Sequence, residues 1–309
     1  MRDNIIKLLA FSGSFLIFLG IFLEKKDSLI EVFNNTFFSE RINVQLEQKN
    51  DYYRDYDFLF VQNTDSFSPT NYQDILNIYY TFLNSGQSTF TFYCPKEYST
   101  CLSDVKGLAN NQDILSNINN YVHPYNSFSH IETEYDSLGR ITIMTSKNYS
   151  EEEIQEINAK IDSLYWKLVD ENSSEKENIQ AIHDYIINHS RYDTERSKND
   201  IVQYKSDIAY GPLFEGYAIC GGYTDLMQLF LEKMNVKSYR VSSNRHIWNA
   251  VFLDNTWYHL DLTWDDPVAD DGNDYLEHNY FLISTKELLE MEVTQHNFPF
   301  EYYQELKEA

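Results

Sequence analysis

The spacing of apolar residues predicts a small mixed α+β unit in the first half of the chain. Over residues 71–86 apolar side chains recur every three or four positions, as on one face of a helix, and Gly86 is a typical carboxy-terminal stop. Residues 88–94 alternate between polar and apolar side chains, which predicts a β-strand. Residues 115–145 predict a helix followed by two strands around the turn sequence DSLG.

Helical spacing returns after this unit. Ser150 and an acidic first turn introduce an amphipathic helix that continues to residue 171, and a second helix is predicted over residues 173–190. A third helix begins near Cys220, and residues 236–243 after it predict a strand. The apolar positions that define one face of this third helix are Tyr223, Leu226, Met227, Phe230 and Met234.

Residues 246–253 and 256–263 predict a β-hairpin whose two-residue loop is Asp254-Asn255. If Leu253 pairs with Thr256, the two faces of the hairpin separate in character. One face is apolar and suits a core: Ile247, Val251, Leu253, Tyr258, Leu260 and Leu262. The other face carries His246, Trp248, Phe252, Trp257, His259 and Asp261. His246 and Asp261 are then diagonal neighbours, within reach of each other. A three-residue loop would put them on opposite faces, and the apolar segregation argues against it.

The amino terminus contains an apolar segment, residues 8–23, followed at once by charged residues. Its length suits the apolar region of a signal peptide and is slightly short for a comfortable membrane span. No small-residue cleavage site follows Leu23, so we expect an uncleaved membrane anchor first, a cleaved secretory signal second and a buried core helix last. Basic residues flank both ends of this apolar segment, so their distribution hardly favours one orientation in the membrane over the other.

Composition narrows the possible functions. At 309 residues the chain is long enough for two folded units. The 24 basic and 48 acidic residues give a net charge of −24, which repels phosphate backbones, and no local basic patch offsets it. We therefore do not expect the protein to bind nucleic acid. The charge also gives no attraction to an anionic membrane surface, and solubility is its simplest role.

The chain has three cysteines, an odd number. In a secreted protein this count suggests one disulfide and one free thiol. Cys94 and Cys101 are close enough in sequence to form the pair, although two buried reduced cysteines fit equally well. Cys220 stands alone. It lies in the first turn of its predicted helix, where unpaired N–H groups and the helix dipole favour a thiolate.

A catalytic interpretation of Cys220 depends on its neighbours. Gly221 and Gly222 would leave room for a substrate carbonyl to reach the N–H groups of the first turn, which can receive an oxyanion. From this stretch alone, a buried structural cysteine beside a glycine packing contact is the favoured interpretation. The hairpin adds what acyl transfer needs, because His246 can serve as base and acid and Asp261 can orient its imidazole. His246, which lies close to Trp248 in sequence, could instead be a packing residue.

Other histidines are weaker candidates. His259 shares a face with Asp261 and could compete for it. His123 and His130 have no partner cysteine or carboxylate pattern, so structural roles are expected for both. The acidic loop at residues 265–277 suggests calcium, but it fails the EF-hand spacing because position 269 is alanine. We therefore predict neither a metal nor a cofactor.

These residues resemble the transglutaminase-like superfamily. The stretch "CGGY" is similar to the opening of the cysteine helix in bacterial members, and "HIWNAVFLDNTWYHLDLTWDDP" is similar to their His-x-Trp-Asn strand, turn and second strand. The segments "IHDYIINHSRYD" and "YFLIS" also fit, so the likeness covers about residues 175–285. It implies a papain-like α+β core with Cys220 as nucleophile, His246 as base and Asp261 as orienting acid.

The resemblance implies an enzyme that forms a thioester from a Gln carboxamide or a peptide bond of a protein or peptide substrate. An amine then resolves the thioester, which is crosslinking, or water does, which is amidase or peptidase action. No side chain upstream of Cys220 can be matched to an oxyanion donor. The alternatives are a catalytically inactive binding module of the cell envelope and a structural or adhesive envelope protein.

The resulting organisation has three parts. Residues 1–27 are a signal peptide or membrane anchor, residues 28–150 an accessory α+β domain, and residues 151–309 the transglutaminase-like catalytic domain. Membrane anchoring would run through residues 8–23, with the catalytic domain outside the cell, or the protein would be secreted.

Overall fold

The computed structural model describes residues 44–46, 48–268 and 275–308. By contacts the chain divides into residues 1–45 and a compact unit of residues 46–309, and only the second is described below.

Two predicted features fall on residues that the structure does not describe. The apolar segment at residues 8–23 lies outside the described residues, and so does the part of the acidic loop at residues 269–274. Within the described ranges, every helix is too short or too polar to span a lipid bilayer.

The described chain alternates helices and strands. The helices are α3 (Tyr72–Ser85), α4 (Cys101–Ala109), α5 (Gln112–Asn119), α6 (Glu151–Leu168), α7 (Glu175–His189), α8 (Thr194–Asn199), α9 (Cys220–Lys233), α10 (Leu262–Asp265) and α11 (Thr285–Glu290). The strands are β1 (Thr89–Tyr93), β2 (Phe128–Tyr135), β3 (Arg140–Lys147), β4 (Arg191–Tyr192), β5 (Tyr217–Ala218), β6 (Ser238–Ser242), β7 (Ile247–Leu253), β8 (Thr256–Leu260) and β9 (Phe281–Ile283). Short helical turns are η1 (Pro124–Asn126), η2 (Gly211–Glu215), η3 (Thr294–His296) and η4 (Gln304–Glu308).

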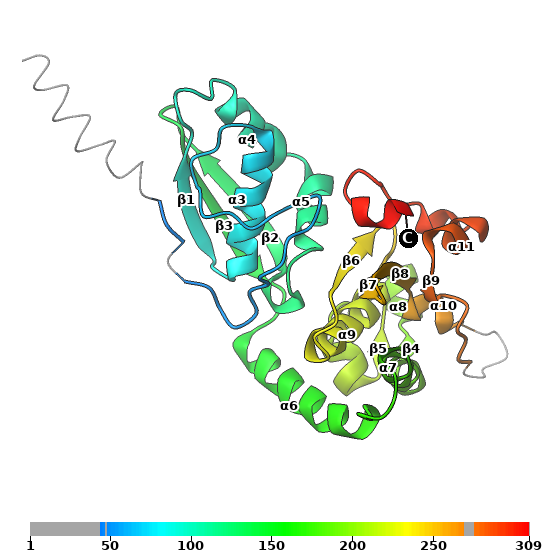
Figure 1. Cartoon of the computed structure of the whole chain (residues 1–309). Coiled ribbons are helices and arrows are strands. Elements are labelled where there is room, and N and C mark those ends of the chain that lie inside the picture. Colours follow the sequence, from blue (N-terminus) through cyan, green and yellow to red (C-terminus); the bar gives the residue numbers. More distant parts are fainter. Residues whose placement is uncertain (1–43, 47, 269–274, 309) are drawn as a thin grey trace, which may run out of the picture. The chain divides into compact units, whose positions relative to one another are not determined.

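The region before residue 150 is the small α+β unit that the apolar spacing predicts. Its strands form an antiparallel sheet in the order β1-β3-β2, with helices α3 to α5 beside it (Figure 1). Gly86 ends α3 in the left-handed conformation, at φ 78°, as the stop signal predicts. Cys94 and Cys101 form a disulfide with their Cα atoms 5.7 Å apart, which settles the alternative between a bridge and two reduced thiols.

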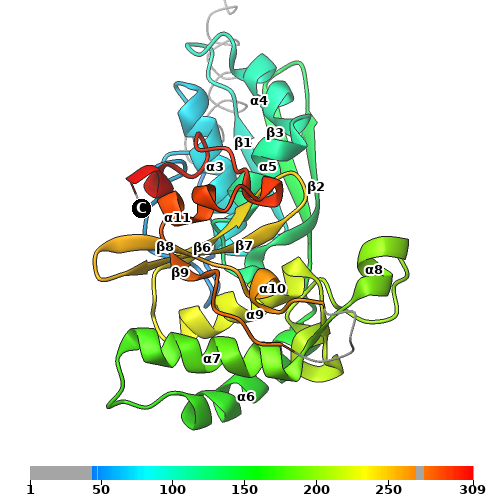
Figure 2. The same ribbon diagram turned by 90° about the vertical axis from the view of Figure 1, so that its right-hand side faces the viewer.

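The second region is built on the antiparallel sheet β6-β7-β8-β9, which α9 covers (Figures 1 and 2). The predicted hairpin register is confirmed, because Leu253 pairs with Thr256 and Ala250 with His259. Asp254 and Asn255 both have positive φ, 51° and 64°, as a two-residue hairpin loop requires.

The ends of this hairpin differ from the prediction. β7 begins at Ile247 and β8 ends at Leu260, so neither His246 nor Asp261 is part of the ladder. Asp261 instead caps α10, and its side chain accepts from the backbone N–H groups of Thr263 and Trp264. The cap bends the chain out of the strand, because a short aspartate side chain satisfies orphan N–H donors that a continuing strand would not have. The predicted strand to residue 263 is therefore wrong by three residues.

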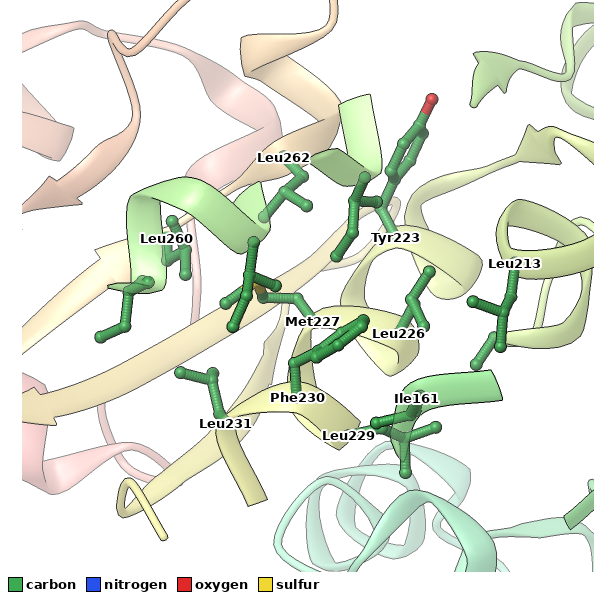
Figure 3. Packing of buried hydrophobic residues seen from close by; sticks show 14 of the residues in the cluster. Ile161, Leu213, Tyr223, Leu226, Met227, Leu229, Phe230, Leu231, Leu260 and Leu262 are labelled. Atoms are coloured by element: carbon green, nitrogen blue, oxygen red, sulfur yellow. The ribbon is translucent and has the colours of Figure 1, made fainter. Parts of the chain in front are cut away.

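The core of this region forms around α9. Figure 3 shows Met227 and Phe230 of this helix in one cluster with Leu260 and Leu262. Met227, Phe230 and Leu260 are fully buried, as the helix and hairpin patterns predict. Burying each such side chain contributes about 1.5–3 kcal/mol, so this cluster holds α9 firmly on the sheet. α7 packs on α9 from the other side (Figure 2).

Buried polar contacts join the two sides of residue 150. Arg54 forms an ion pair with Glu232 of α9 and donates to the backbone oxygen of Tyr121 at 2.7 Å. Arg240 of β6 donates to Asp225 at 2.9 Å and to the backbone oxygen of Asn119. Residues 46–309 form one compact unit by contacts. The boundary between an accessory and a catalytic domain at residue 150 stays a prediction.

Candidate active site

Cys220 is the first residue of α9 and carries a free, partly exposed thiol. The N-cap residue, Ile219, provides no side-chain cap, and Tyr223 is the first residue whose N–H bonds back to Ile219. The N–H groups of Cys220, Gly221 and Gly222 therefore have no acceptor within the helix. These groups and the helix dipole give the start of α9 the partial positive charge that stabilises a thiolate or an oxyanion.

Backbone packing also requires the glycine pair, and the predicted substrate clearance stays a prediction. A Cβ atom on Gly221 would lie 2.6 Å from the backbone oxygen of Asp207, and one on Gly222 would lie 2.3 Å from that of Ser206. Both glycines are needed because the backbone of residues 206–208 packs directly against the start of α9. This contact fixes the position of the Cys220 turn.

Two hydrogen bonds hold the start of β7 against α9. Thr224, one turn after Cys220, donates its hydroxyl to the backbone oxygen of Ile247 at 2.9 Å. The Asn249 amide donates to the backbone oxygen of Thr224 at 3.1 Å. Because His246 directly precedes β7, these bonds place its imidazole next to Cys220.

The structure brings together all three predicted site residues. His246 Nε2 donates to Asp261 Oδ2 at 2.5 Å, and the same imidazole is hydrogen-bonded to Cys220. Since Asp261 occupies Nε2, Nδ1 is the ring nitrogen that remains for the thiol. His246 is 5% exposed and Asp261 is 1% exposed, so little water screens the pair.

Electrostatics in this pocket favour a charged imidazole. Burial by itself would lower the pKa of His246, but the Asp261 carboxylate outweighs it and, with Cys220, raises that pKa to about 10. Burial would raise the pKa of Asp261, but His246 and a second histidine hold it well below its ordinary value. The pair is therefore an imidazolium and a carboxylate at neutral pH.

The second histidine is His296, which sequence analysis missed. Its Nε2 donates to Asp261 Oδ2 at 2.8 Å, the same oxygen that accepts from His246. Asp261 Oδ1 accepts from the N–H groups of Thr263 and Trp264 at 3.0 and 3.4 Å. Four donors thus converge on one buried carboxylate.

The surroundings of His296 are aromatic. Its ring lies 5.1 Å from Trp248, 5.3 Å from Trp264 and 5.0 Å from Tyr280, measured between centroids. Its Nδ1 is buried and has no hydrogen-bond partner within the described chain. His296 ends the short turn η3, far from the hairpin motif, so no spacing in the sequence connects it to Asp261.

His259 does not compete for Asp261. Trp248 Nε1 donates to its Nδ1 at 2.9 Å, and its Nε2 lies 2.9 Å from Thr285 Oγ1. Complete burial lowers the pKa of His259 to about 3, so the ring is neutral. It is a packing residue of the hairpin. His123 is likewise buried and structural, with its ring stacked on Tyr52.

Tyr192 is a further neighbour that sequence analysis did not single out. β4 pairs in parallel with β5, which sets Tyr192 beside Ala218, two residues before Cys220. Burial raises the pKa of Tyr192, and the negative charges of Cys220 and Asp261 add to this effect. Its hydroxyl lies 3.1 Å from that of Ser197.

Among the described residues, two groups of side chains are arranged so that they could hold a metal ion. One is His246, Asp261 and His296, and the other is His183, Asp184 and His278. In the first group each imidazole donates an N–H to Asp261, so these contacts are explained by hydrogen bonds without a metal ion.

The part of the chain that carries this site matches a protein-family model. Residues 163–262 match the family model described as the transglutaminase-like superfamily. This part of the chain is therefore similar to transglutaminase-like domains. The resemblance that the cysteine helix and the hairpin indicate is thereby confirmed, together with the α+β class. The transglutaminase-like match includes Cys220, His246 and Asp261 and ends before His296.

Solved structures give weaker similarities. A transglutaminase structure has 15% identity and a TM-score of 0.34, and the match covers 44% of this chain and 45% of that one. A candidate cysteine protease from Cytophaga hutchinsonii has 12% identity and a TM-score of 0.28, with 43% of this chain and 61% of that one covered. The chain thus spans about half the length of the solved structures it matches. The comparison with curated proteins finds no match.

Proposed function

We propose that the chain is a cysteine acyltransferase or hydrolase with Cys220 as nucleophile, His246 as base and acid, and Asp261 as orienting carboxylate. The observation that supports this most directly is the chain of hydrogen bonds from Cys220 to His246 to Asp261. A thiol at a helix start, an imidazole and a buried carboxylate are the combination that thioester chemistry requires.

In the first half-reaction the Cys220 sulfur attacks the carbonyl carbon of a Gln carboxamide or a peptide bond. The imidazolium of His246 gives its proton to the departing nitrogen, and ammonia or an amine leaves. The product is a thioester between Cys220 and the acyl group. Asp261 keeps the imidazole in the orientation that this proton transfer needs.

In the second half-reaction an amine or water attacks the thioester. His246 takes the proton of the incoming nucleophile, and the Cys220 sulfur leaves as thiolate. An amine yields an isopeptide crosslink, and water yields a carboxylic acid. The unpaired N–H groups at the start of α9 are the donors available to the oxyanion in both half-reactions.

A groove lined by segments that adjoin His246 and His296 in sequence suits an extended polar substrate, although none of the three proposed catalytic residues lines it. Its volume is ≈ 800 Å³, and its lining includes Ser243 and Asn244, just before His246, and Asn297, just after His296. Asn117 and Glu301 supply further polar groups along it. Protein or peptide segments are therefore the proposed substrate class.

A cell-surface location is part of the proposal. The apolar segment at residues 8–23 would anchor the chain or direct its export. The Cys94–Cys101 disulfide supports this, because disulfides persist in oxidising compartments outside the cytosol.

Alkylation of the thiol tests the proposed nucleophile. Iodoacetamide should label Cys220 at neutral pH much faster than a free cysteine in a peptide, and Cys94 and Cys101 should stay unlabelled in non-reducing buffer. A Gln-mimicking electrophile should label the same residue. The Asp55→Asn variant, which changes an exposed carboxylate far from the site in sequence, is the matched control. Labelling no faster than that of the peptide would contradict an activated thiol and favour an inactive binding module.

Mass spectrometry of envelope peptides incubated with the protein decides the fate of the acyl group. Isopeptide bonds would show resolution by an amine, and deamidated glutamines or cleaved peptides would show resolution by water. Cys220→Ser should abolish every such product. Product formation that survives this substitution would rule out the thioester route.

A further inference from the structure

A second group of histidines and carboxylates lies outside the proposed triad. It comprises His183, Asp184, Asp265 and His278, and is called the His183 cluster below. α7 carries His183 and Asp184, α10 carries Asp265, and His278 precedes β9. Helix α7 therefore meets the distant segment that runs from α10 to β9, and α7 and α10 contact each other.

The geometry of the His183 cluster centres on one oxygen atom. His183 Nδ1 lies 2.8 Å from Asp184 Oδ1, and His278 Nε2 lies 2.7 Å from the same oxygen. These three atoms all lie within 4.8 Å of one another, close enough to share one ion. His183 is completely buried, whereas the side chains of Asp184 and His278 are 30% and 38% exposed. The cluster thus has a rigid inner side and an open outer side.

On the inner side, a carboxylate contacts the second ring nitrogen of His183, as is usual for metal-binding histidines. His183 Nε2 lies 3.1 Å from Asp265 Oδ2, and Asp265 Oδ1 accepts the N–H of Tyr280 at 2.9 Å. A histidine that donates one N–H to a fixed carboxylate presents the lone pair of its other nitrogen. In His183 that nitrogen is Nδ1, and it faces the Asp184 oxygen. Two acceptors that face each other need a cation or a proton between them.

The charges of the cluster favour a divalent cation. With neutral imidazoles, Asp184 and Asp265 contribute two negative charges. Within the described ranges the ion-pair partners of these two carboxylates are histidines, and neither pairs with a lysine or an arginine. The chain as a whole carries a net charge of −24, which also favours cations over anions.

We propose that the His183 cluster binds a divalent transition-metal ion, with Zn²⁺ expected, through His183 Nδ1, His278 Nε2 and Asp184 Oδ1. Imidazole nitrogens with a carboxylate suit Zn²⁺ and not Ca²⁺, which takes oxygen ligands. Zn²⁺ bonds of about 2.0–2.1 Å at tetrahedral angles separate ligand atoms by about 3.3 Å. The two contacts with Asp184 Oδ1 must lengthen by only about half an ångström, which the exposed side chains of Asp184 and His278 can accommodate.

The fourth position has a candidate ligand on the same helix face. Gln180 lies three residues before His183 on α7, and its Nε2 is 3.4 Å from His278 Nε2. Turning the amide over would present Oε1 to the ion, and water would serve otherwise. The ion would join α7 to the segment before β9, and through Asp265 to α10, whose cap is Asp261. Its expected role is to fix these segments together.

Metal binding is testable on the full chain without an activity assay. The Cys220→Ala background removes the free thiol as a competing ligand, and no affinity tag should be present. In this background Zn²⁺ should raise the melting temperature, and Co²⁺ should give the visible absorption bands of a tetrahedral site. His278→Ala and Asp184→Asn each remove one ligand at the exposed side. Each should weaken Zn²⁺ affinity by at least about 10–100-fold.

His296→Phe is the matched control, because it alters the other histidine group and leaves the His183 cluster intact. Its Zn²⁺ and Co²⁺ responses should equal those of the background. The proposal fails if Zn²⁺ and Co²⁺ have no effect on the background protein, or if His278→Ala responds as strongly as the background does. Loss of the response in His296→Phe alone would also overturn it, because the ion would then occupy the group around Asp261.

Discussion

Two clusters in this chain consist of the same types of side chain in the same local arrangement. In each, two imidazoles converge on one oxygen of an aspartate: Asp261 Oδ2 near the thiol, and Asp184 Oδ1 in the His183 cluster. They differ in what surrounds that oxygen. Asp261 is 1% exposed and its other oxygen accepts two backbone N–H groups, whereas the Asp184 side chain is 30% exposed.

The difference shows how surroundings decide the chemistry of one residue set. At Asp261 each of the two imidazoles donates its own proton to the carboxylate. The Cys220 thiol lies at the other ring nitrogen of His246, so the arrangement suits proton transfer. In the His183 cluster a second carboxylate faces the same ring, and the outer side opens to solvent. That arrangement suits a cation. If this contrast holds, substitutions at the Asp261 carboxylate should have the largest effects on the reactivity of Cys220.

Removing the carboxylate charge at the first cluster should have the largest effect. Asp261→Asn keeps the shape of the side chain but no longer holds the imidazolium of His246. We expect the rate of acyl transfer to fall by about 10²–10⁴-fold. Where no substrate is known, alkylation of Cys220 at pH 7 should slow by about 10–30-fold, because an ordinary thiol is still about 3% thiolate at that pH. Asp55→Asn should stay within about twofold of the wild type. Equal rates in the two variants would contradict a catalytic role for Asp261.

The same ion pair should give the stability of the protein a defined pH dependence. The folded pKa of His246 is about 10, above its ordinary 6.5, so its stabilising contribution is complete below pH 6.5 and is lost as the pH rises through 10. The folded pKa of Asp261 is lowered, so its contribution is present above its ordinary 3.8 and lost as the pH falls below it. The stabilisation is therefore greatest between pH 3.8 and 6.5.

Urea denaturation at several pH values would measure this dependence. The unfolding free energy of the wild type relative to Asp261→Asn should fall by at most about 1.4 kcal/mol per pH unit between pH 6.5 and 10. A difference that stays constant over this range would show that His246 is not held as an imidazolium.

The first cluster also depends on the glycine pair at the start of α9. Gly222→Ala would place a Cβ 2.3 Å from the backbone oxygen of Ser206, which cannot move aside freely. We expect a loss of about 1–3 kcal/mol in unfolding free energy and slower alkylation of Cys220. Gly107→Ala is the control, because α4 leaves open space there and alanine should stabilise the helix by about 0.5–1 kcal/mol. Equal effects of the two substitutions would contradict the close backbone contact.

Local sequence patterns carried most of the prediction. The face of α9, the register of the hairpin and the stop at Gly86 follow from short-range spacing and turn chemistry, and each is confirmed. The proximity of His246 and Asp261 also followed from the register. The strand end was missed because the capping of α10 by Asp261 competes with the ladder, and apolar alternation cannot reveal a cap.

What the sequence could not show depends on contacts between distant segments. The glycine pair is explained by the backbone of residues 206–208, for which the sequence near Cys220 gives no signal. The His183 cluster joins α7 to His278 across about 95 positions, and His296 reaches Asp261 across 35. A lone histidine in a short turn has no periodicity, so only the folded chain identifies it.

The role of His296 is the most demanding test of the contrast, because its effect should be small and specific. As a second donor to Asp261 Oδ2 it is a positioning residue that keeps the carboxylate in place for His246. His296→Phe retains an aromatic ring among Trp248, Trp264 and Tyr280 but loses the donor. We expect turnover to fall about 10-fold, about 1.4 kcal/mol, with little change in KM.

The pH profile separates positioning from simple packing. Without the second donor, Asp261 should hold the His246 proton more tightly and raise its pKa. The upper step in the pH profile of Cys220 alkylation reports the loss of that proton, so this step should move to higher pH in His296→Phe. His296→Gln restores an N–H donor and should return the step toward the wild-type position. His130→Phe, an exposed site on β2, should leave the profile unchanged. If His296→Phe and His296→Gln give the same profile as the wild type, His296 only fills space and the catalytic cluster ends at three residues.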